Sequence, residues 1–221
     1  MTRRLLWLLG LLVASSKVTA AQDSLPLATL DRDVAMRLTR IVDSAGSRGL
    51  PTEPIVAKIS QGVFFHAAPD RIVVAAQSVV ARLEEARVAL APKPTQSDIA
   101  AGENALGVDG VTKTALQAIR STSPNRPVAV PLGLLAQLVA SKVPLARATK
   151  IVTDLIKRGA SDPQLLALGN NVSADVVHGA QAMASLDVRL RGLTAVLAPL
   201  GSAAAAVDGP QSAASGPGKK P

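Results

Sequence analysis

The amino-acid sequence predicts an all-α protein. Apolar residues recur with a period near 3.6 from residue 30 to residue 199, which is the pattern of amphipathic helices. Glycine, proline, serine and threonine interrupt this pattern at short intervals, so the predicted helices are short. The chain has 221 residues, of which 48% are hydrophobic. It is therefore long enough for one ordinary core and is not a disordered polyelectrolyte.

The first half of the chain predicts five helices, over residues 30–45, 52–63, about 70–90, about 96–106 and about 113–120. Gly46 and Gly49 are expected to end the first of them. Pro54 is tolerated in the first turn of the second, because first-turn amides have no helical partner to lose. Thr95 is the predicted N-cap of the fourth, and Asp98 lies three residues later at the capping-box position.

The second half predicts helices over 131–141, 144–158 and 185–199, and two further helices capped by Ser161 and Ser173. Residues 131–141 are the most apolar part of the predicted domain. A helix that is apolar on most sides is buried on most sides, so we expect this one at the centre, with Pro131 in its first turn. A short buried strand at 127–131 is the alternative, because Val128 and Val130 alternate in the sequence.

The predicted interhelix loops share a pattern. A small or polar residue is followed by a small apolar residue and then by Pro, Ser or Thr, as expected for a helix C-cap followed at once by a new N-terminus. The pattern occurs at residues 49–51, 67–69, 110–112, 142–144, 159–161 and 171–173. Because the spacing varies, the loops do not define a strict repeat. Two arrangements therefore stay open: an irregular orthogonal bundle, or a short solenoid-like array of helical hairpins.

The N-terminus has the form of a secretory signal peptide. Arg3 and Arg4 give it a positive start, and residues 5–14 form a short apolar run. Small residues then precede the expected cleavage after Ala20 or Ala21. The apolar run is too short to span a bilayer comfortably, because a spanning helix takes about 20 apolar residues. A twin-arginine signal and an uncleaved anchor are the alternatives.

Three parts are therefore predicted: a signal peptide at 1–20, an α-helical domain at 21–200 and a disordered tail at 201–221. The tail is mainly Ala, Gly, Ser, Pro and Lys, which cannot bury enough apolar surface to order itself. We expect an exported protein, periplasmic or extracellular, with no transmembrane span in the mature chain. The absence of cysteine favours a bacterial envelope, because exported eukaryotic domains usually contain disulfides.

Cleavage would also lower the net charge. The whole chain carries 24 basic and 16 acidic side chains, and its first 20 residues hold three of the basic ones and none of the acidic ones. The net charge therefore falls from +8 to +5. This moderate excess does not by itself indicate nucleic-acid binding, and an exported protein rarely meets nucleic acid, so we expect no such partner.

The residue counts exclude several chemistries. Without cysteine there is no disulfide scaffold, no thiol nucleophile and no cysteine-based metal site, and two histidines are too few for a histidine-rich one. No P-loop, dinucleotide fingerprint or GxSxG motif occurs. We therefore predict no catalytic residue, no metal and no cofactor.

Both histidines have an acidic neighbour in the sequence. An unrecognised active site, with His66 as a general base beside Asp70, is an alternative, although no nucleophile motif accompanies these residues. Asp175 precedes His178 by three residues, so the two side chains share one helix face. One histidine and one aspartate are too few ligands for a metal site.

One short segment resembles a known family. Residues 107–116, Gly-Val-Asp-Gly-Val-Thr-Lys-Thr-Ala-Leu, resemble a fragment of the small peptidoglycan-binding helical domain, in which an Asp-Gly turn precedes a helix with a threonine and an Ala-aliphatic pair. The segment lacks that family's second glycine before the threonine and its terminal Phe-Gln. The resemblance implies peptidoglycan binding, but the recurring loop pattern explains the same ten residues, so we assign no family.

The best candidate for recognition is a set of basic residues on the predicted helix 144–158 and just before it: Lys142, Arg147, Lys150, Lys157 and Arg158. Such a face would attract an anionic envelope polymer or an acidic protein. Asp154 precedes Arg158 by four residues, in the favourable order for an ion pair. A solvated helix face that happens to be basic is the simpler interpretation.

The sequence thus predicts an exported, non-enzymatic helical interaction or structural protein of the bacterial envelope. Its partner is unidentified, and the candidates are another envelope protein or an anionic envelope polymer. The alternative function is a polyanion- or peptidoglycan-binding module that uses the basic helix. A second alternative is an enzyme with an unrecognised active site.

Ultraviolet absorbance tests the predicted cleavage. Trp7 is the only tryptophan and the chain has no tyrosine, so cleavage after Ala20 or Ala21 removes the last strong absorber at 280 nm. We expect exported protein to begin at Ala21 or Gln22 on N-terminal sequencing and to show almost no absorbance at 280 nm. Exported protein that retains Trp7 would contradict the prediction.

Overall fold

The computed structural model describes residues 30–197, which form nine α-helices and no strand. The helices are α1 (Arg32–Ser47), α2 (Glu53–Phe64), α3 (Pro69–Ala89), α4 (Gln96–Leu106), α5 (Lys113–Thr122), α6 (Ala129–Ala140), α7 (Leu145–Lys157), α8 (Asp162–Val177) and α9 (Ala182–Val196). The all-α prediction is confirmed for this part of the chain. The predicted signal peptide and the predicted tail at 201–221 lie outside the described residues.

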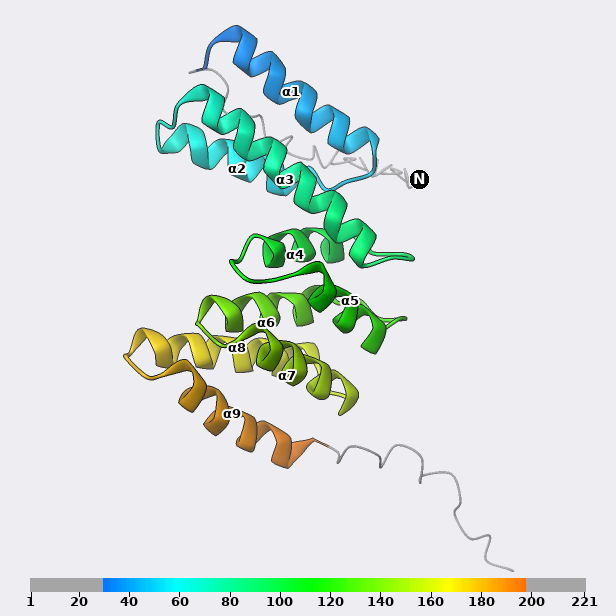
Figure 1. The fold of residues 1–221 in the computed structure, drawn as a ribbon, viewed down its shortest axis with the longest axis vertical. Coiled ribbons are helices and arrows are strands. Elements are labelled where there is room, and N and C mark those ends of the chain that lie inside the picture. Colours follow the sequence, from blue (N-terminus) through cyan, green and yellow to red (C-terminus); the bar gives the residue numbers. More distant parts are fainter. Residues whose placement is uncertain (1–29, 198–221) are drawn as a thin grey trace, which may run out of the picture.

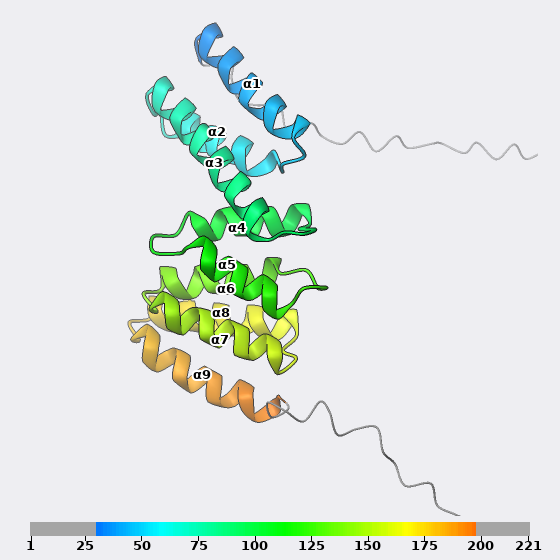
Figure 2. The ribbon, with the colours of Figure 1, turned by 45° about the vertical axis from the view of Figure 1, so that its right-hand side comes forward.

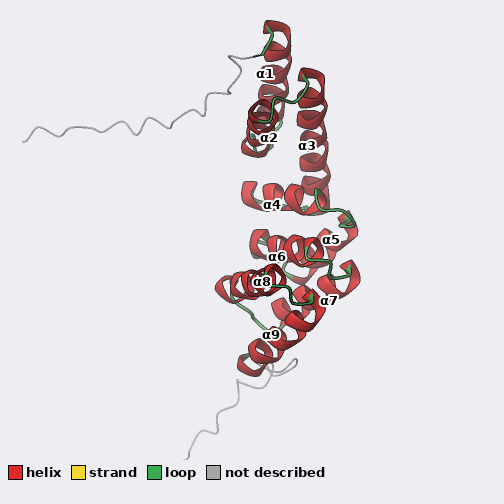
Figure 3. Ribbon diagram, turned by 90° about the vertical axis from the view of Figure 1, so that its left-hand side faces the viewer, coloured by secondary structure: helices red, strands yellow, loops and turns green. Residues whose placement is uncertain are grey.

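The helices stack in two layers (Figures 1 and 2). In one layer α4 packs on α6 and α6 on α8, and in the other α3 packs on α5 and α5 on α7. Figure 3 shows the two layers beside each other, with α4, α6 and α8 on the left and α3, α5 and α7 on the right. Helices α6 and α7, and α8 and α9, form antiparallel hairpins across the layers, while α1 and α2 pack on α3. Each helix of the stack therefore packs mainly on near neighbours in the sequence.

The most apolar helix lies in the middle of the stack and packs mainly on three others. Helix α6 contacts α4, α7 and α8, and Leu132, Leu135 and Leu138 on it are fully buried. Its predicted central position is therefore confirmed, with Pro131 in the first turn. The alternative strand at 127–131 is wrong, because the helix begins at Ala129, and Val128 is buried just before it.

Five interhelix turns share one hydrogen-bonding pattern. The residues with positive φ that follow α1, α2, α6, α7 and α8 are Gly49, His66, Lys142, Gly159 and Gly179. At each turn the next amide donates to a carbonyl five residues earlier, as Leu50 does to Ala45 at 3.1 Å. This Schellman motif satisfies the last carbonyls of the helix. The apolar residues that follow three of these turns, Leu50, Val143 and Ala160, are buried, as the loop pattern predicts.

The sixth predicted loop, at 171–173, is wrong, because α8 runs through it without a break. Val172 continues the buried apolar stripe of Leu165 and Leu168, so packing keeps the segment helical. Ser173 is not an N-cap: its Oγ accepts a hydrogen bond from Nε2 of Gln137 on α6, at 2.8 Å.

Glycine permits a close crossing of α3 and α4. A Cβ on Gly102 of α4 would lie 2.9 Å from the Cβ of Ala86 on α3 and 3.1 Å from Cδ1 of Leu90. Neither Ala86 nor the buried Leu90 has room to move, so only glycine fits there. Gly133 of α6 is different, because its added Cβ would meet no atom within 4 Å.

We expect Gly102→Ala to destabilise the protein despite the higher helix propensity of alanine, by about 1–3 kcal/mol for an overpacked core. Gly133→Ala is the control, with an expected gain of about 0.5–1 kcal/mol, because a helix-interior glycine is entropically unfavourable. Urea unfolding followed by circular dichroism measures both changes. Equal effects of the two substitutions would show that the crossing at Gly102 is looser than described.

Candidate functional site

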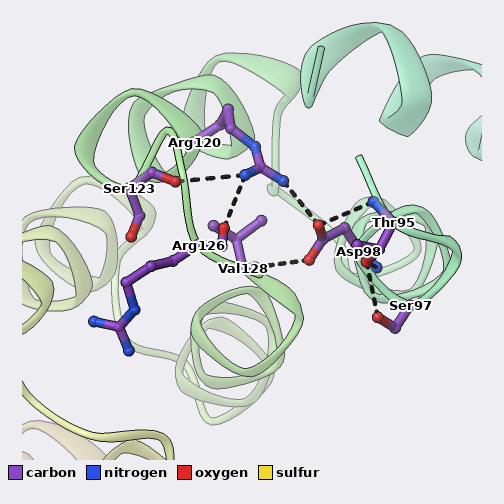
Figure 4. Close-up of polar contacts among 7 residues, drawn as sticks. All are labelled: Thr95, Ser97, Asp98, Arg120, Ser123, Arg126 and Val128. Carbon is purple, nitrogen blue, oxygen red and sulfur yellow. Dashed lines mark hydrogen bonds and ion pairs between the residues drawn. The ribbon is translucent and has the colours of Figure 1, made fainter. Parts of the chain in front are cut away.

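A buried carboxylate joins three helix ends (Figure 4). The Oδ2 of Asp98 accepts hydrogen bonds from Thr95 N–H at 3.1 Å and from Nη2 of Arg120 at 2.8 Å. Its Oδ1 accepts from Val128 N–H, just before α6, at 2.7 Å. Nη1 of Arg120 also donates to the carbonyl of Arg126 at 2.9 Å. The site ties the start of α4 to the end of α5 and the start of α6, which is a structural role.

Asp98 is ionised in this environment. Burial alone would raise the pKa of its carboxyl group, but the hydrogen bonds from Val128, Thr95 and Arg120 outweigh burial and hold the pKa below its ordinary value. The predicted capping box is confirmed, since Thr95 Oγ1 accepts from Asp98 N–H at 3.1 Å. The pairing with Arg120, 22 residues away, was not predicted, because nothing local in the sequence signals it.

The predicted basic residues do not form one free cluster. Arg147 pairs with Asp187 of α9, and Lys150 pairs with Asp154 at 2.6 Å. Lys142 lies in the turn before α7, whereas Lys157 and Arg158 lie at its far end, about 20 Å away for a helix of this length. The predicted pair of Asp154 with Arg158 does not form, because Asp154 engages the lysine one turn earlier instead.

The residues of the alternative active site do not meet. Asp70 pairs with Arg37 of α1 at 3.3 Å, and its side chain is 86% exposed. His66 occupies the positive-φ position of the turn between α2 and α3, and it makes no side-chain hydrogen bond among the described residues.

Asp175 joins α8 to α9 instead of pairing with His178. Its carboxylate accepts two hydrogen bonds from Arg189, at 3.0 and 2.9 Å, and one from Ser185. These bonds, first that of Arg189 and then that of Ser185, lower the pKa of Asp175 to about 2. His178 uses Nδ1 to contact the carbonyl of Ala174 at 2.7 Å.

No family model, curated protein or solved structure matches the chain. The resemblance of residues 107–116 to the peptidoglycan-binding domain therefore stays a local one; in the structure they form the turn before α5 and the start of that helix. Within residues 30–197, no helix is long and apolar enough to cross a membrane. The same residues contain no group of three His, Asp or Glu side chains arranged to hold a metal ion.

One exposed surface lacks charge. It is formed by α4, α6 and α8, and we call it the uncharged face. Its exposed and half-exposed residues are Gln96, Ser97, Ala100, Asn104, Val130, Gly133, Gln137, Ala140, Gln164, Leu166, Ala167, Asn170 and Asn171. Only amide, hydroxyl, small and aliphatic groups occur among them.

The charges of these three helices are buried or paired. Helix α6 has no charged residue. On α4, Asp98 is buried, and Glu103 accepts two hydrogen bonds from Arg82 of α3. On α8, the two aspartates pair with Arg126 and Arg189 near the helix ends. The layer of α3, α5 and α7, in contrast, exposes many charges, including those of Glu85, Lys113 and Lys150.

Two pockets flank α8. The first, of about 380 Å³, is enclosed by α4, α6 and α8, and its lining includes Asn104, Gly133, Gln137 and Leu166. The second, of about 370 Å³, lies between α8 and α9 and is lined in part by Asn171, Val188, Gly192 and Leu193. Both combine amide groups with apolar walls, which suits a ligand that is apolar with a few polar groups.

This surface was not predicted from the sequence. Its members come from three helices separated by whole hairpins, so no local motif unites them. The absence of charge from residues 129–140 is visible in the sequence and could have indicated it, but that apolarity was assigned wholly to burial.

Removing the charge of Asp98 should destabilise the folded protein. We expect Asp98→Asn to lower the free energy of unfolding at pH 7 by about 3–5 kcal/mol, because Arg120 is left as a buried, unpaired cation. Asp109→Asn is the control, because Asp109 is exposed in the turn after α4. Urea unfolding of the three proteins measures the difference.

Lowering the pH should reduce the difference in unfolding free energy between the wild type and Asp98→Asn. A carboxyl group with a lowered folded pKa stabilises the protein above its unfolded pKa, near 3.8, and the stabilisation is lost as the pH falls through the folded value. The gap between wild type and Asp98→Asn should therefore be complete at pH 5 and above and shrink below 3.8. A gap that stays constant down to pH 2 would contradict the ionised state of Asp98.

Proposed function

We propose that this protein is a non-enzymatic binding module of the bacterial envelope, and that its uncharged face holds a partner polypeptide. The observation that carries the proposal is the separation of charge between the two layers. Three adjacent helices expose amides and small apolar groups, although 18% of the whole chain is charged. Stacked helical arrays characteristically offer such an extended surface for binding.

The roles of the ionisable groups support a binding module over an enzyme. Asp98, Glu103 and Asp175 each pair with an arginine of another helix, so their chemistry is used to hold the array together. The two pockets beside α8 are lined by amides, aliphatic groups and Arg189, which is already paired with Asp175, and no nucleophile and base are in contact there.

The location in the envelope rests on the sequence alone. The form of the N-terminus, with its arginines and short apolar run, supports export. The lack of cysteine supports a bacterial rather than a eukaryotic compartment.

A second candidate is binding of an anionic envelope polymer by the basic residues of α7. Lys142, Lys157 and Arg158 form no ion pair with other described residues, which favours it. The distance between the two ends of α7 and the pairing of Arg147 and Lys150 leave only one adjacent pair of free cations. Two exposed cations give little affinity at physiological salt, so the uncharged face is the stronger candidate.

Photo-crosslinking in the producing cells tests the proposal. A benzoylphenylalanine placed at Asn104 or Asn170 should form one defined protein adduct, because both positions lie on the uncharged face. The same probe at Gln117 of α5 or Ala146 of α7, on exposed positions of the other layer, should not.

A charge introduced on the uncharged face tests whether the crosslink depends on that surface. Ala140→Glu, combined with the probe at Asn104, should reduce the adduct several-fold, since a carboxylate desolvated against an uncharged partner is unfavourable. Adducts of equal yield from both layers, or no adduct from the uncharged face, would reject the proposal.

A further inference from the structure

Two helix-interior glycines lie in the pockets beside α8 without a structural reason for being glycine. Gly133 of α6 lines the first pocket and Gly192 of α9 lines the second. Neither has positive φ, and an added Cβ on either would meet no atom within 4 Å. Glycine inside a helix is destabilising relative to alanine, so the fold alone favours a larger residue at both positions.

The other helix-interior glycines near the core do have such a reason. An added Cβ on Gly62 would lie 2.8 Å from Ile72, and on Gly102 it would lie 2.9 Å from Ala86. On Gly169 it would lie 2.1 Å from Oε1 of Gln137. Gly133 and Gly192 are therefore distinguished by keeping space open rather than by allowing close packing.

Each pocket also holds one large apolar side chain in partial contact with water. Leu166 is 51% exposed in the first pocket and Val188 is 60% exposed in the second. A ligand that covers either side chain gains hydrophobic free energy, so each pocket suits an apolar group of the ligand.

The surface between the pockets is polar but uncharged. It is the exposed side of α8, where Asn170 lies between Leu166 of the first pocket and the Ala167 and Asn171 edge of the second. Amide side chains offer both a donor and an acceptor, which match the N–H and C=O groups of a peptide backbone. The single charged residue of the pocket walls, Arg189, is already held by Asp175.

The size of α8 sets the spacing of the apolar groups. A helix with its side chains is about 10 Å across. A peptide in the polyproline II conformation advances about 3.1 Å per residue, and its side chains return to the same face every three residues. Such a peptide laid across α8 therefore reaches from one pocket to the other in about three residues, with the first and last side chains on the same face.

The lining disfavours other classes of ligand. The absence of free positive charge gives no attraction for a polyanion or an anionic lipid surface. The pocket walls contain no aromatic side chain on which a sugar ring could stack.

We propose that the uncharged face binds an uncharged peptide segment of the partner in the polyproline II conformation, which crosses α8 and places apolar side chains spaced three residues apart in the Gly133 and Gly192 pockets. This inference rests on the proposed function and specifies the chemistry of the partner. It requires that the two glycines remain small.

Fluorescence anisotropy with synthetic peptides tests the inference, using protein purified after expression of the full chain. The probe is a labelled, uncharged peptide of about ten serine and glycine residues that carries two leucines three residues apart, which is one turn of polyproline II and long enough to cross α8. Matched peptides carry the leucines side by side, or carry aspartates in their place. We expect the first peptide to bind at least about tenfold more tightly than either of the others, because only it fills both pockets.

Substitutions that fill the two pockets provide a second test of the inference. Gly133→Leu and Gly192→Leu should each weaken binding of the first peptide about tenfold, because the new side chain occupies the space of a ligand group. Neither substitution should cost stability, since the added Cβ meets no atom at either site. Ala146→Leu, on the exposed side of α7, is the matched control and should leave binding unchanged.

Peptides that bind equally, or binding that the two leucine substitutions leave unchanged, would overturn the inference. The crosslinks from Asn104 and Asn170 separate this failure from failure of the proposed function. If those adducts persist while the peptide results fail, the peptide inference falls and the binding face stands. If the adducts are also absent, both fall.

Discussion

The stack depends on one buried carboxylate. Asp98 receives hydrogen bonds from the amides at two helix starts and from the guanidinium at one helix end, so it fixes three elements at once. The first of these bonds closes a local capping box, and the others join one hairpin to the next. Because α6 begins at this point and then contacts α4, α7 and α8, the position of the whole second half of the array follows from it.

Ion pairs between the layers also explain why the layer of α4, α6 and α8 exposes so little charge. Glu103 follows Asp98 on α4 and is turned inward to Arg82, so both acidic residues of that helix are used between the layers. Helix α6, enclosed by three others, has only a narrow strip left for solvent. Ion pairs that hold the layers together therefore leave a surface of amides and small residues. The ion pairs that stabilise the fold thus also leave the uncharged face available for the proposed binding role.

Features that depend on neighbouring residues could be predicted from the sequence. The period of apolar residues, the Thr95 capping box and the loop residues reflect contacts within a few positions, and they located most helices within two or three residues. Where local and tertiary preferences conflict, the prediction failed. Asn171 and Ser173 have the composition of a helix boundary, yet the buried stripe through Val172 keeps α8 continuous. Asp154 likewise has two possible ion-pair partners, Lys150 four residues before it and Arg158 four residues after it. Spacing alone does not show which of them forms the pair.

The array also has a mechanical consequence. Among residues 30–197, α9 packs on α8 and has no comparable neighbour on its other side, whereas α6 packs mainly on three helices. In a stack of nearest-neighbour contacts, such an end opens at a lower free energy than the centre, so amide hydrogens of α9 should exchange with solvent before those of α6. The pocket between α8 and α9 thus belongs to a hairpin that opens more readily than the centre. A ligand bound in this pocket would hold α9 against α8. The end of the stack would then open less readily than it does without the ligand.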